Sequence, residues 1–322
     1  MTIYDDYIEY CNTYITRFGP DTVVLMQIGD FFELYGVQNE AEVVGADMYR
    51  VAGICNLIVS RKNKSVLDNS RQNPLMMGFP LYAIQKQSQA LVQAGFTVVI
   101  IRQVTPPPDV KREVTEVLSP STLLAPANMH GTGGGNGGAP TGYGTHLMVG
   151  FFERHGNILG LGLAFADLST GRIFIKEAIR SGDMDDGGSF ALDELVRVVS
   201  IFPPAELLLT TDSGSSTQTY WKDIRQTCKG LCSKVHDKLN AASPSPTDNI
   251  LSEATKMNYQ TEVFRRAFPE DTSSLLSVHE ILQVERRPMA AVALVHLLQF
   301  IYEHNEQLLW KIQLPIAIEQ AP

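Results

Sequence analysis

A glycine-rich run near the middle of the chain constrains the fold more than any other feature. Eight of the fourteen residues from Gly131 to Gly144 are glycine. No helix or strand can pack through such a run, because ordering glycine costs much backbone entropy and there are no side chains to bury. A phosphate-binding loop would end in Gly-Lys-Ser/Thr between a strand and a helix, and this run has no such ending. We therefore expect a flexible linker or insertion over residues 121–145, with a folded unit on each side.

The composition excludes several classes of protein. A length of 322 residues allows two domains and part of a third, and the net charge of −9 argues against a general nucleic-acid binder. No apolar run approaches the ~20 residues of a membrane span, and the first twenty residues are too acidic for a signal peptide. The four cysteines are too few and too scattered for a disulfide framework, which predicts reduced thiols and an intracellular location.

Helices and strands alternate in the first unit, which predicts an α/β fold. Residues 2–18 have apolar side chains at helical spacing behind Thr2 as a candidate N-cap. Residues 23–28 and 31–35 are predicted strands joined by a turn at Gly29-Asp30. The remaining expected elements are a helix over 40–49, a strand over 75–78, a helix over 83–94, and strands over 96–101 and 111–118.

The second unit begins with three predicted strands, over residues 147–152, 158–168 and 172–176, followed by a helix over 190–199 and a strand over 206–210. A polar, proline-containing stretch at 240–249 marks another linker. From residue 277 onward, apolar residues recur at helical spacing and form a wide face, with Val292, Leu298 and Leu309 among them. Nothing evident in the chain covers this face, so we expect a helical domain that continues elsewhere.

A local cluster of basic residues departs from the acidic balance of the chain. Between positions 50 and 72 the only acidic residue is Asp68, and the basic residues are Arg50, Arg61, Lys62, Lys64 and Arg71. Such a patch can bind phosphates even in an acidic protein. The alternative is an ordinary solvated loop.

The segment from Val24 to Gly36, VLMQIGDFFELYG, resembles the signature of the MutS family of DNA mismatch-repair proteins. In that family a Gly-Asp-Phe-aromatic-Glu-Leu run carries the phenylalanine and glutamate that test a base pair. The residues Gln27-Ile28-Gly29 and the Phe-Phe-Glu variant that follows are similar to those of the family branch found in large DNA viruses and some mitochondria. Other segments resemble the family in the same order: 77–80, 94–99, 102–103, 112–114 and 119–122 in the mismatch-binding domain, 166–171 and 202–208 in the connector, and 290–309 in the core.

The resemblance implies a domain order and a fold class. It implies a mixed-sheet α/β mismatch-recognition domain at 1–120, a connector of RNase H-like topology at 146–245, and the first helices of an α-helical core or lever domain at 246–322. The family's ATPase domain, with ATP and Mg, carries a Gly-x-x-x-x-Gly-Lys-Ser/Thr loop that is absent from this sequence. We therefore expect an N-terminal fragment that is not an enzyme and needs no cofactor, while the full-length protein has a dimer partner and repair partners.

By the resemblance, Phe31 is the wedge that enters the minor groove of kinked duplex DNA. Unstacking a base step costs a few kcal/mol and base–aromatic stacking returns ~1–3 kcal/mol, so insertion is favoured where pairing is already broken. Glu33 projects from the same strand face and is assigned to the mispaired base, whereas Phe32 points to the core. The contacts with the DNA backbone are assigned to Arg61, Lys62 and Lys64. The alternative for Phe31 is core packing.

The competing hypothesis of an enzyme function is a nuclease. RNase H-type catalysis gathers several carboxylates around two metal ions, and Asp167 on a predicted strand could be the first of them. However, Asp193 and Glu194 lie on a predicted helix and Glu206 lies at a strand start. Asp167 is followed by Ser-Thr-Gly, which favours a turn-forming aspartate.

Two further alternatives concern metal binding and protein partners. Cys228, Cys232 and His236 recur every four residues, which allows a partial zinc site but favours one stripe of a half-buried helix. The acidic part of the chain from residue 119, with 16 Lys and Arg against 22 Asp and Glu, could instead dock a repair partner. In that case the chain is a protein-interaction module with little DNA affinity of its own.

Overall fold

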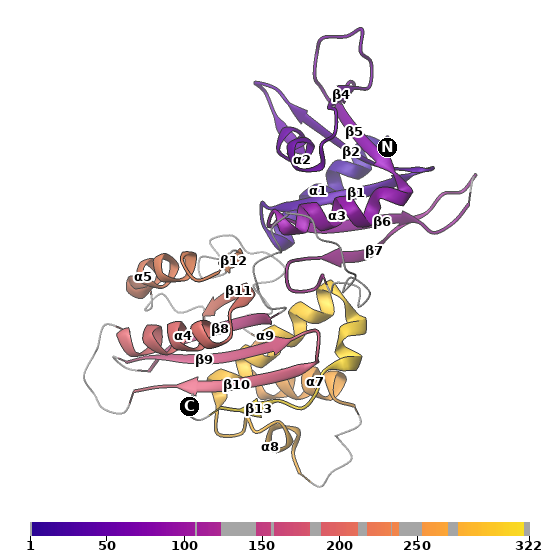
Figure 1. The fold of residues 1–322 in the computed structure, drawn as a ribbon. Coiled ribbons are helices and arrows are strands. Elements are labelled where there is room, and N and C mark those ends of the chain that lie inside the picture. The colour runs from indigo at the N-terminus through magenta and orange to yellow at the C-terminus, as the bar shows by residue number, and fades with distance from the viewer. Residues whose placement is uncertain are drawn as a thin grey trace, which may run out of the picture. The chain divides into compact units, whose positions relative to one another are not determined.

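The computed structural model describes residues 2–106, 108–123, 146–155, 158–180, 188–211, 218–232, 234–237, 253–269 and 276–318 (Figure 1). The chain divides into two compact units, Met1–Leu123 and Leu124–Pro322, each built around one sheet. The glycine-rich run from Gly131 to Gly144 and the linker expected at 240–249 lie outside the described residues. Within the described ranges, no helix is both long enough and apolar enough to cross a membrane.

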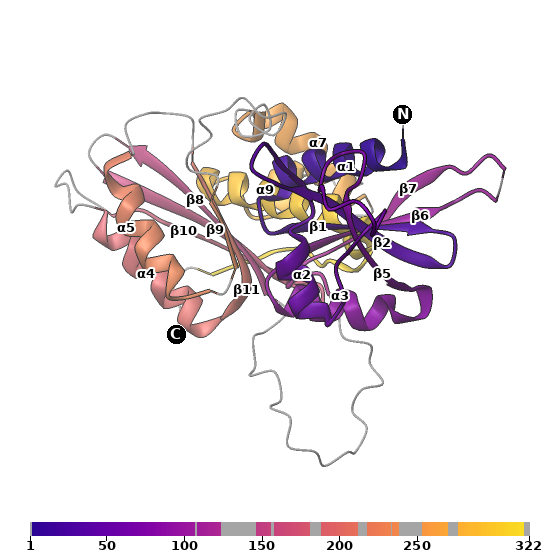
Figure 2. The ribbon, with the colours of Figure 1, turned by 90° about the horizontal axis from the view of Figure 1, so that it is seen from above.

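The first unit contains a seven-stranded mixed sheet in the order β4-β5-β2-β1-β6-β7, with β3 paired to β2. β1 and β6 run parallel and the other neighbours run antiparallel. α1 covers one face of the sheet, and α2 and α3 cover the other (Figures 1 and 2). The elements are α1 (Ile3–Phe18), β1 (Thr22–Ile28), β2 (Phe31–Gln38), β3 (Val43–Gly45), α2 (Met48–Cys55), β4 (Ser60–Arg61), β5 (Leu75–Pro80), η1 (Leu81–Ala83), α3 (Ile84–Gln93), β6 (Thr97–Gln103) and β7 (Arg112–Leu118).

Helix α1 begins and ends where its sequence predicts. Thr2 and Asp5 form a capping box, in which each side chain accepts a hydrogen bond from the backbone N–H of the other residue. Gly19 ends the helix at a φ of 95°, a conformation that glycine adopts without steric cost. Tyr7 is fully buried under the helix and its hydroxyl donates to the Val24 carbonyl of β1 at 2.9 Å. Helix α1 is therefore fastened to the sheet by a polar contact as well as by packing.

The helix expected over residues 40–49 is wrong. Val43–Gly45 forms β3, which pairs with β2, and α2 begins only at Met48 behind Asp47 as N-cap. Gly45 has a φ of 84°, and a Cβ atom there would lie 2.5 Å from the Tyr35 carbonyl oxygen. The left-handed glycine and its close approach to β2 prevent a helix, and the two β-branched valines before it suit a strand.

The second unit contains a six-stranded sheet in the order β12-β11-β8-β9-β10-β13. β8, β9 and β10 form successive antiparallel hairpins, and β11 lies parallel to both β8 and β12. The strands are β8 (His146–His155), β9 (Ile158–Asp167), β10 (Arg172–Ala178), β11 (Pro204–Thr211), β12 (Lys234–Asp237) and β13 (Ile316–Ala317). The helices are α4 (Ser189–Ile201), α5 (Gln218–Lys229), α7 (Met257–Ala267), α8 (Val278–Ile281), α9 (Pro288–His304) and η4 (Glu306–Lys311).

Alternate residues of this sheet belong to two different cores. Along β8, Leu147 and Val149 pack with α9, whereas Met148 and Phe152 pack with residues of α4 and α5. Because strand side chains alternate between faces, a strand covered on both faces is apolar along its whole length. The unit is therefore a three-layer α/β/α arrangement, with α4 and α5 on one face and α7 and α9 on the other (Figure 2).

The apolar face of α9 is covered within the chain, so the expectation that nothing here covers it is wrong. At Gly162 of β9, an added Cβ would lie 2.2 Å from the Met289 carbonyl carbon and oxygen, so the helix rests directly on the strand backbone. Glu177 of β10 accepts hydrogen bonds from the first backbone N–H groups of α9, at 2.8 Å from Met289 and 3.2 Å from Ala290. The helix ends at His304, and Leu309 lies in η4. The division into connector and core domains stays a prediction.

Candidate nucleic-acid interface

The turn between β1 and β2 fixes the position of Phe31. Ile28 and Phe31 pair across the turn, and Gly29 has a φ of 58°. The Leu81 N–H donates to the Asp30 carbonyl at 3.0 Å, and the Gln27 side-chain amide donates to the Gly29 carbonyl at 3.2 Å. The predicted strand–turn–strand is confirmed, and its tip is held by groups from β1 and from the residue that follows β5.

Phe31 and Phe32 have opposite environments. Phe31 is 48% exposed at the first position of β2, and Phe32 is completely buried. Phe32 packs against Phe79 of β5 with ring centroids 5.9 Å apart, and the Arg102 guanidinium lies 5.4 Å from its ring centroid. An exposed phenylalanine beside a tight turn contributes little to the core, and it is the side chain type that can stack on a base. The alternative that Phe31 is a core residue is wrong.

Glu33 lies on the same face of β2 as Phe31 and is partly buried. Its carboxylate accepts a hydrogen bond from the hydroxyl of Tyr35, which is the next residue on that face. Tyr35 is 3% exposed and packs edge-on against two tyrosines of α1, Tyr4 at 4.8 Å and Tyr7 at 5.4 Å between centroids. Burial raises the pKa of Tyr35 well above its usual value, and the Glu33 carboxylate adds to the effect. The face is thus open at Phe31 and closed by α1 at Tyr35.

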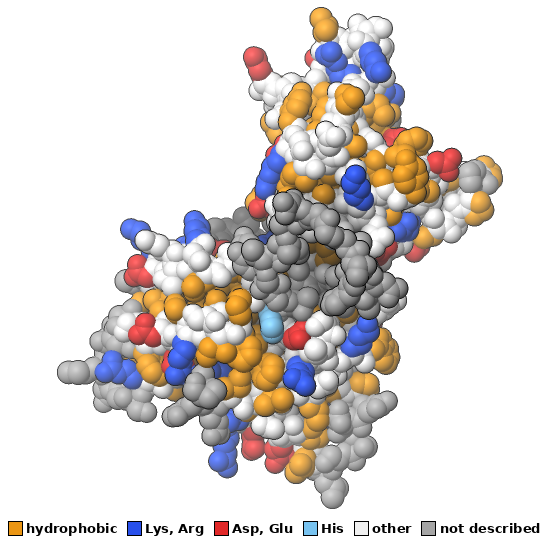
Figure 3. All heavy atoms as spheres, in the orientation of Figure 1, with side chains coloured by type: hydrophobic (Ala, Val, Ile, Leu, Met, Phe, Trp, Pro, Cys, Tyr) orange, Lys and Arg blue, Asp and Glu red, His pale blue; other side chains and the backbone are white. Residues whose placement is uncertain are grey.

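The three predicted backbone-contacting cations occupy different positions. Lys62 is exposed and its ammonium lies 4.5 Å from the ring centroid of Tyr4, which joins it to the face that carries Glu33. Arg61 is partly buried and donates to the Leu67 carbonyl at 2.5 Å, so its guanidinium supports the loop between β4 and β5. Lys64 is exposed in that loop. Figure 3 shows Lys and Arg side chains at the end of the first unit where Figure 1 places this loop.

Asn73 organises the loop that carries these cations. Its side-chain amide is buried and donates to the carbonyls of Asn63, Val66 and Asp68, and its side-chain oxygen accepts from the Asn63 N–H at 2.7 Å. One asparagine therefore satisfies several backbone groups that a loop would otherwise leave to water. The conformation of this loop is therefore fixed by hydrogen bonds within the loop.

A polar network behind the turn was missed by sequence reasoning. Arg112 of β7 donates from Nε to the Gln27 carbonyl at 3.1 Å, and the Gln103 N–H of β6 donates to the Gln27 side-chain oxygen at 3.2 Å. With its amide oxygen facing donors, Gln103 accepts from the Gly29 N–H and from Arg112 Nη2, each at 3.2 Å. Gln103 and Arg112 lie in segments that carry the family resemblance, which was the available signal for them.

Comparison with known proteins agrees with this geometry. Residues 13–126 match the model of MutS domain I. The chain is 28% identical, over 98% of its length, to a MutS homologue of Acanthamoeba polyphaga mimivirus that is named a DNA mismatch repair protein. It is 28% identical to the DNA mismatch repair protein MutS of Thermus aquaticus and 30% identical to MutS 2 of Haloarcula marismortui, each over 64% of the chain. The chain therefore contains a MutS domain I, and it is similar to MutS proteins over nearly its whole length.

The MutS domain I match includes all five predicted DNA-contacting residues, which lie between positions 31 and 64. The matches cover 28% of the mimivirus protein, 20% of the Thermus aquaticus protein and 17% of the Haloarcula marismortui protein. The chain therefore spans between about a sixth and somewhat more than a quarter of the length of these MutS relatives.

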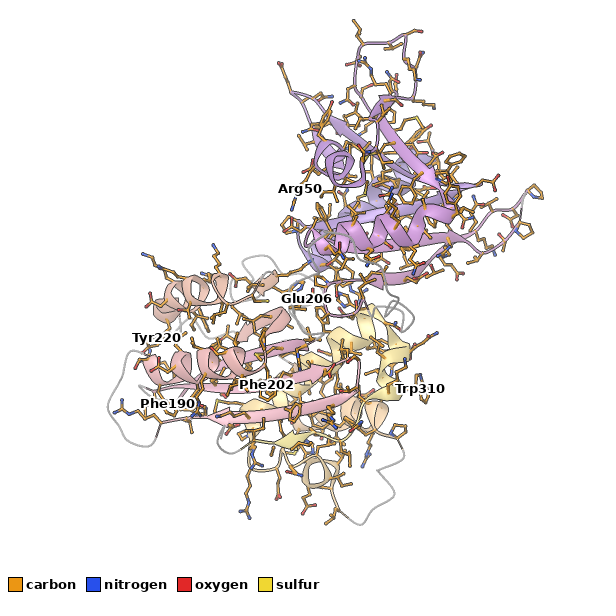
Figure 4. The ribbon with its side chains drawn as sticks, viewed as in Figure 1. Arg50, Phe190, Phe202, Glu206, Tyr220 and Trp310 are labelled. Carbon is orange, nitrogen blue, oxygen red and sulfur yellow. The ribbon has the colours of Figure 1, made fainter. Side chains whose placement is uncertain are left out.

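Among the residues that the structure describes, the carboxylates considered for a nuclease do not form one cluster. Asp167 accepts hydrogen bonds from Ser169 and Thr170 and forms the predicted hairpin turn. Glu194 of α4 forms ion pairs with Lys176 and Arg197, both at 2.7 Å. Glu206, labelled in Figure 4, is fully buried in β11 and lies 2.8 Å from His236. Asp167, Glu194 and Glu206 each have a local structural partner, which argues against an RNase H-type metal pair.

The expectation that Cys228, Cys232 and His236 line one helix stripe is wrong. Helix α5 ends at Lys229, so Cys232 follows the helix and His236 lies on β12. Burial raises the pKa of the Cys228 thiol to about 12, so the thiol carries its proton at neutral pH in the protein without a metal. Among the residues that the structure describes, no three His, Cys, Asp or Glu side chains are grouped as a metal site would require.

Proposed function

We propose that the first unit recognises duplex DNA at a mismatch or unpaired base. In this proposal Phe31 enters the minor groove and stacks at the defective step, Glu33 contacts the mispaired base, and Lys62 and Lys64 contact phosphates. Arg61 supports the β4–β5 loop and adds positive charge beside it. The observation that carries the proposal is Phe31 itself: a MutS domain I presents a 48% exposed phenylalanine at a rigid turn, one residue before a buried one.

The turn is suited to act as a wedge because it is braced from behind. Gln27, Gln103 and Arg112 tie it to three strands of the sheet. A wedge on a mobile loop would lose conformational entropy when it entered the stack, whereas a braced ring loses little. The energy of inserting Phe31 then depends mainly on the DNA step, because a step with broken pairing costs less to unstack and kink.

Glu33 adds discrimination against sound duplex. A carboxylate near the groove is repelled by phosphates, and a Watson–Crick pair offers it no unpaired donor. A mispaired base has such a donor and can satisfy the carboxylate. This chain is also proposed to bind DNA without a cofactor and without hydrolysing ATP, since its sequence has no Gly-x-x-x-x-Gly-Lys-Ser/Thr loop.

The test is competition binding of the chain to a matched duplex and to the same duplex with one G·T mismatch or one unpaired base. Wild type should prefer the defective duplex, and Phe31→Ala should lose most of that preference. Tyr49→Ala is the matched control, because Tyr49 is an aromatic residue of the first unit that is 60% exposed on α2. A preference that persists in Phe31→Ala would exclude the wedge. Equal, weak binding to both duplexes by wild type would favour the protein-interaction module.

A further inference from the structure

We propose that Tyr35 is a positioning residue that orients the Glu33 carboxylate as a hydrogen-bond acceptor and so selects mispaired bases that present a ring N–H. This inference rests on the proposed contact between Glu33 and the mispaired base. It adds a specificity-determining residue and names the chemical class of base that the site favours. Thymine and guanine belong to that class, whereas adenine and cytosine present an unprotonated ring nitrogen at the same edge.

The geometry of β2 places three functional groups in order along one face. Phe31 is exposed, Glu33 is partly buried and Tyr35 is almost completely buried. The Tyr35 hydroxyl donates to Oε2 of Glu33. A base that stacks near Phe31 would therefore meet a carboxylate that is already held from its buried side.

Tyr35 is a fixed donor because its ring and its backbone are both held. Its ring lies against Tyr4 and Tyr7 of α1, and Tyr7 is itself bonded to the Val24 carbonyl at 2.9 Å. The Tyr35 carbonyl accepts from the Ala46 N–H at 3.0 Å. Burial raises the pKa of the Tyr35 phenol, so the hydroxyl keeps its proton at every pH at which duplex DNA is studied.

The charged and titratable groups around this pair come from two elements and one loop. Tyr4 and Tyr7 belong to α1, Lys62 follows β4 with its ammonium 4.5 Å from the Tyr4 ring centroid, and Arg112 of β7 exerts a positive charge on Tyr35. Tyr35 is the residue of this group that donates to Glu33. Removing the Tyr35 hydroxyl therefore removes a hydrogen bond that holds the Glu33 carboxylate in place.

The consequence for base recognition follows from the donors and acceptors that a carboxylate offers. An ionised carboxylate only accepts, and a protonated one can also donate. A donor on one oxygen favours the ionised form and leaves the other oxygen for a second donor. Glu33 held in this way attracts a base with a ring N–H and repels a base with a lone pair there.

The experiment is competition binding of the whole chain to four duplexes that are identical except for one unpaired T, G, A or C. The variants are Tyr35→Phe, which keeps the buried ring, and Tyr4→Phe, which removes a hydroxyl from the same aromatic cluster without touching Glu33. Wild type and Tyr4→Phe should favour T and G over A and C. In Tyr35→Phe this preference should fall about three- to tenfold, the effect expected of losing one hydrogen bond of ordinary strength.

A double-mutant readout separates the orientation of Glu33 from general stability. In a Glu33→Gln background, adding Tyr35→Phe should change base preference by less than about twofold, because the carboxylate is already gone. A purely structural role for Tyr35 would instead give the same change in base preference in the wild-type and Glu33→Gln backgrounds.

The outcomes distinguish this inference from the proposed function. If wild type does not prefer any unpaired base over matched duplex, the proposed function fails and the inference falls with it. If wild type prefers defective duplex but Tyr35→Phe retains the wild-type base preference, the inference alone is overturned. The inference is also overturned if the Tyr35→Phe effect is undiminished in Glu33→Gln.

Discussion

Phe31 and Phe32 are consecutive residues of β2, yet 48% of the Phe31 surface is exposed and Phe32 is completely buried. The two rings point to opposite faces of the sheet because strand side chains alternate. One ring therefore stabilises the domain and the other is available to a partner. This separation makes the wedge testable, since stability and recognition can be changed at adjacent positions.

The first prediction contrasts these two residues in stability. Phe32→Ala should lower the free energy of unfolding by about 3–5 kcal/mol, because it leaves a cavity beside Phe79. Phe31→Ala should lower it by less than about 1 kcal/mol, because 48% of the Phe31 surface stays in water and its removal leaves no enclosed cavity. Urea titrations followed by circular dichroism measure both values. Equal losses would show that Phe31 belongs to the core.

The second prediction concerns the braced turn. Gln103→Met removes the side-chain oxygen that accepts from the Gly29 N–H. We expect the Gly29 amide to exchange with solvent at least about tenfold faster, with a loss of roughly 1 kcal/mol in stability. Hydrogen exchange followed by nuclear magnetic resonance reports this amide, and the Leu25 amide in the interior of β1 serves as the reference. Unchanged protection of Gly29 would show that Gln103 does not hold the turn.

The third prediction tests the contact between α9 and β9. Gly162→Ala should destabilise the second unit by more than about 3 kcal/mol, because its Cβ would lie 2.2 Å from backbone atoms of Met289 that cannot move without shifting the helix. Gly53→Ala is the control, since Gly53 is exposed on α2 with no atom within 4 Å of the added Cβ. That change should stabilise slightly, by about 0.5–1 kcal/mol.

Tryptophan fluorescence reports the Gly162→Ala result because both tryptophans lie in the second unit. Trp221 of α5 is 3% exposed, whereas Trp310, labelled in Figure 4, is 80% exposed. The change on unfolding therefore comes mainly from Trp221. A Gly162→Ala variant as stable as wild type would contradict the close approach of α9 to the sheet.

The fourth prediction is a loss of stability in acid that depends on His304. Burial lowers the pKa of His304 to about 3, and its ordinary value is 6.5. A histidine whose pKa is depressed in the folded state contributes stability above its unfolded pKa and loses it as pH falls. Between about pH 6.5 and 4.5, this group should cost about 1.4 kcal/mol for each pH unit, the value for one proton.

His304→Gln tests this expectation because the side-chain amide can still donate to the Phe300 carbonyl, as Nδ1 of His304 does at 2.8 Å. The variant should show a pH slope smaller by about one proton in urea unfolding followed by Trp221 fluorescence. Below about pH 4.5 both proteins should lose further stability, because the pKa of Glu206 lies below its usual value in the folded protein. Burial alone would raise this pKa, but the hydrogen bond and the charge of His236 lower it by more. Identical slopes above pH 4.5 would contradict the role of His304.

The fifth prediction concerns salt. Each lysine that contacts a phosphate adds about 0.9 to the slope of log K against log salt on duplex DNA. Lys62→Gln and Lys64→Gln should each reduce the slope by about one, whereas Lys86→Gln on α3 should leave it unchanged, because α3 covers the opposite face of the sheet from α1. Affinity measured from 50 to 200 mM salt gives the slopes. An effect of Lys86→Gln equal to that of Lys62→Gln would show that the contacts are nonspecific.

Local sequence patterns predicted most elements of both sheets because turns and caps carry their own signals. Thr2 with Asp5, Gly19 and the Gly29-Asp30 turn each mark a boundary that the structure confirms. The resemblance predicted that Phe31 is available to DNA, and strand alternation then placed Phe32 in the core. These features depend on a few neighbouring residues, which a single sequence displays.

The errors arose where distant residues decide the outcome. Residues 43–45 form a strand because β2 is available to pair with them, and β2 lies outside residues 40–49. The cover for α9 comes from β8 and β9, more than a hundred residues earlier in the chain. The hydrogen bond from Tyr35 to Glu33 also depends on α1, which buries the Tyr35 ring. Tertiary packing decides such features, and the periodicity of a local segment carries no information about which distant residues pack against it.

The most direct test of the wedge is a measurement of DNA bending. A short duplex with a donor dye at one end and an acceptor dye at the other is prepared in matched form and with one unpaired thymine. On saturation with the wild-type chain, energy transfer should rise for the defective duplex, because insertion of Phe31 kinks the DNA by roughly 20–90°. Phe31→Ala should bind it without that rise. Binding of the defective duplex by wild type with no change in energy transfer, or equal bending by Phe31→Ala, would contradict the account.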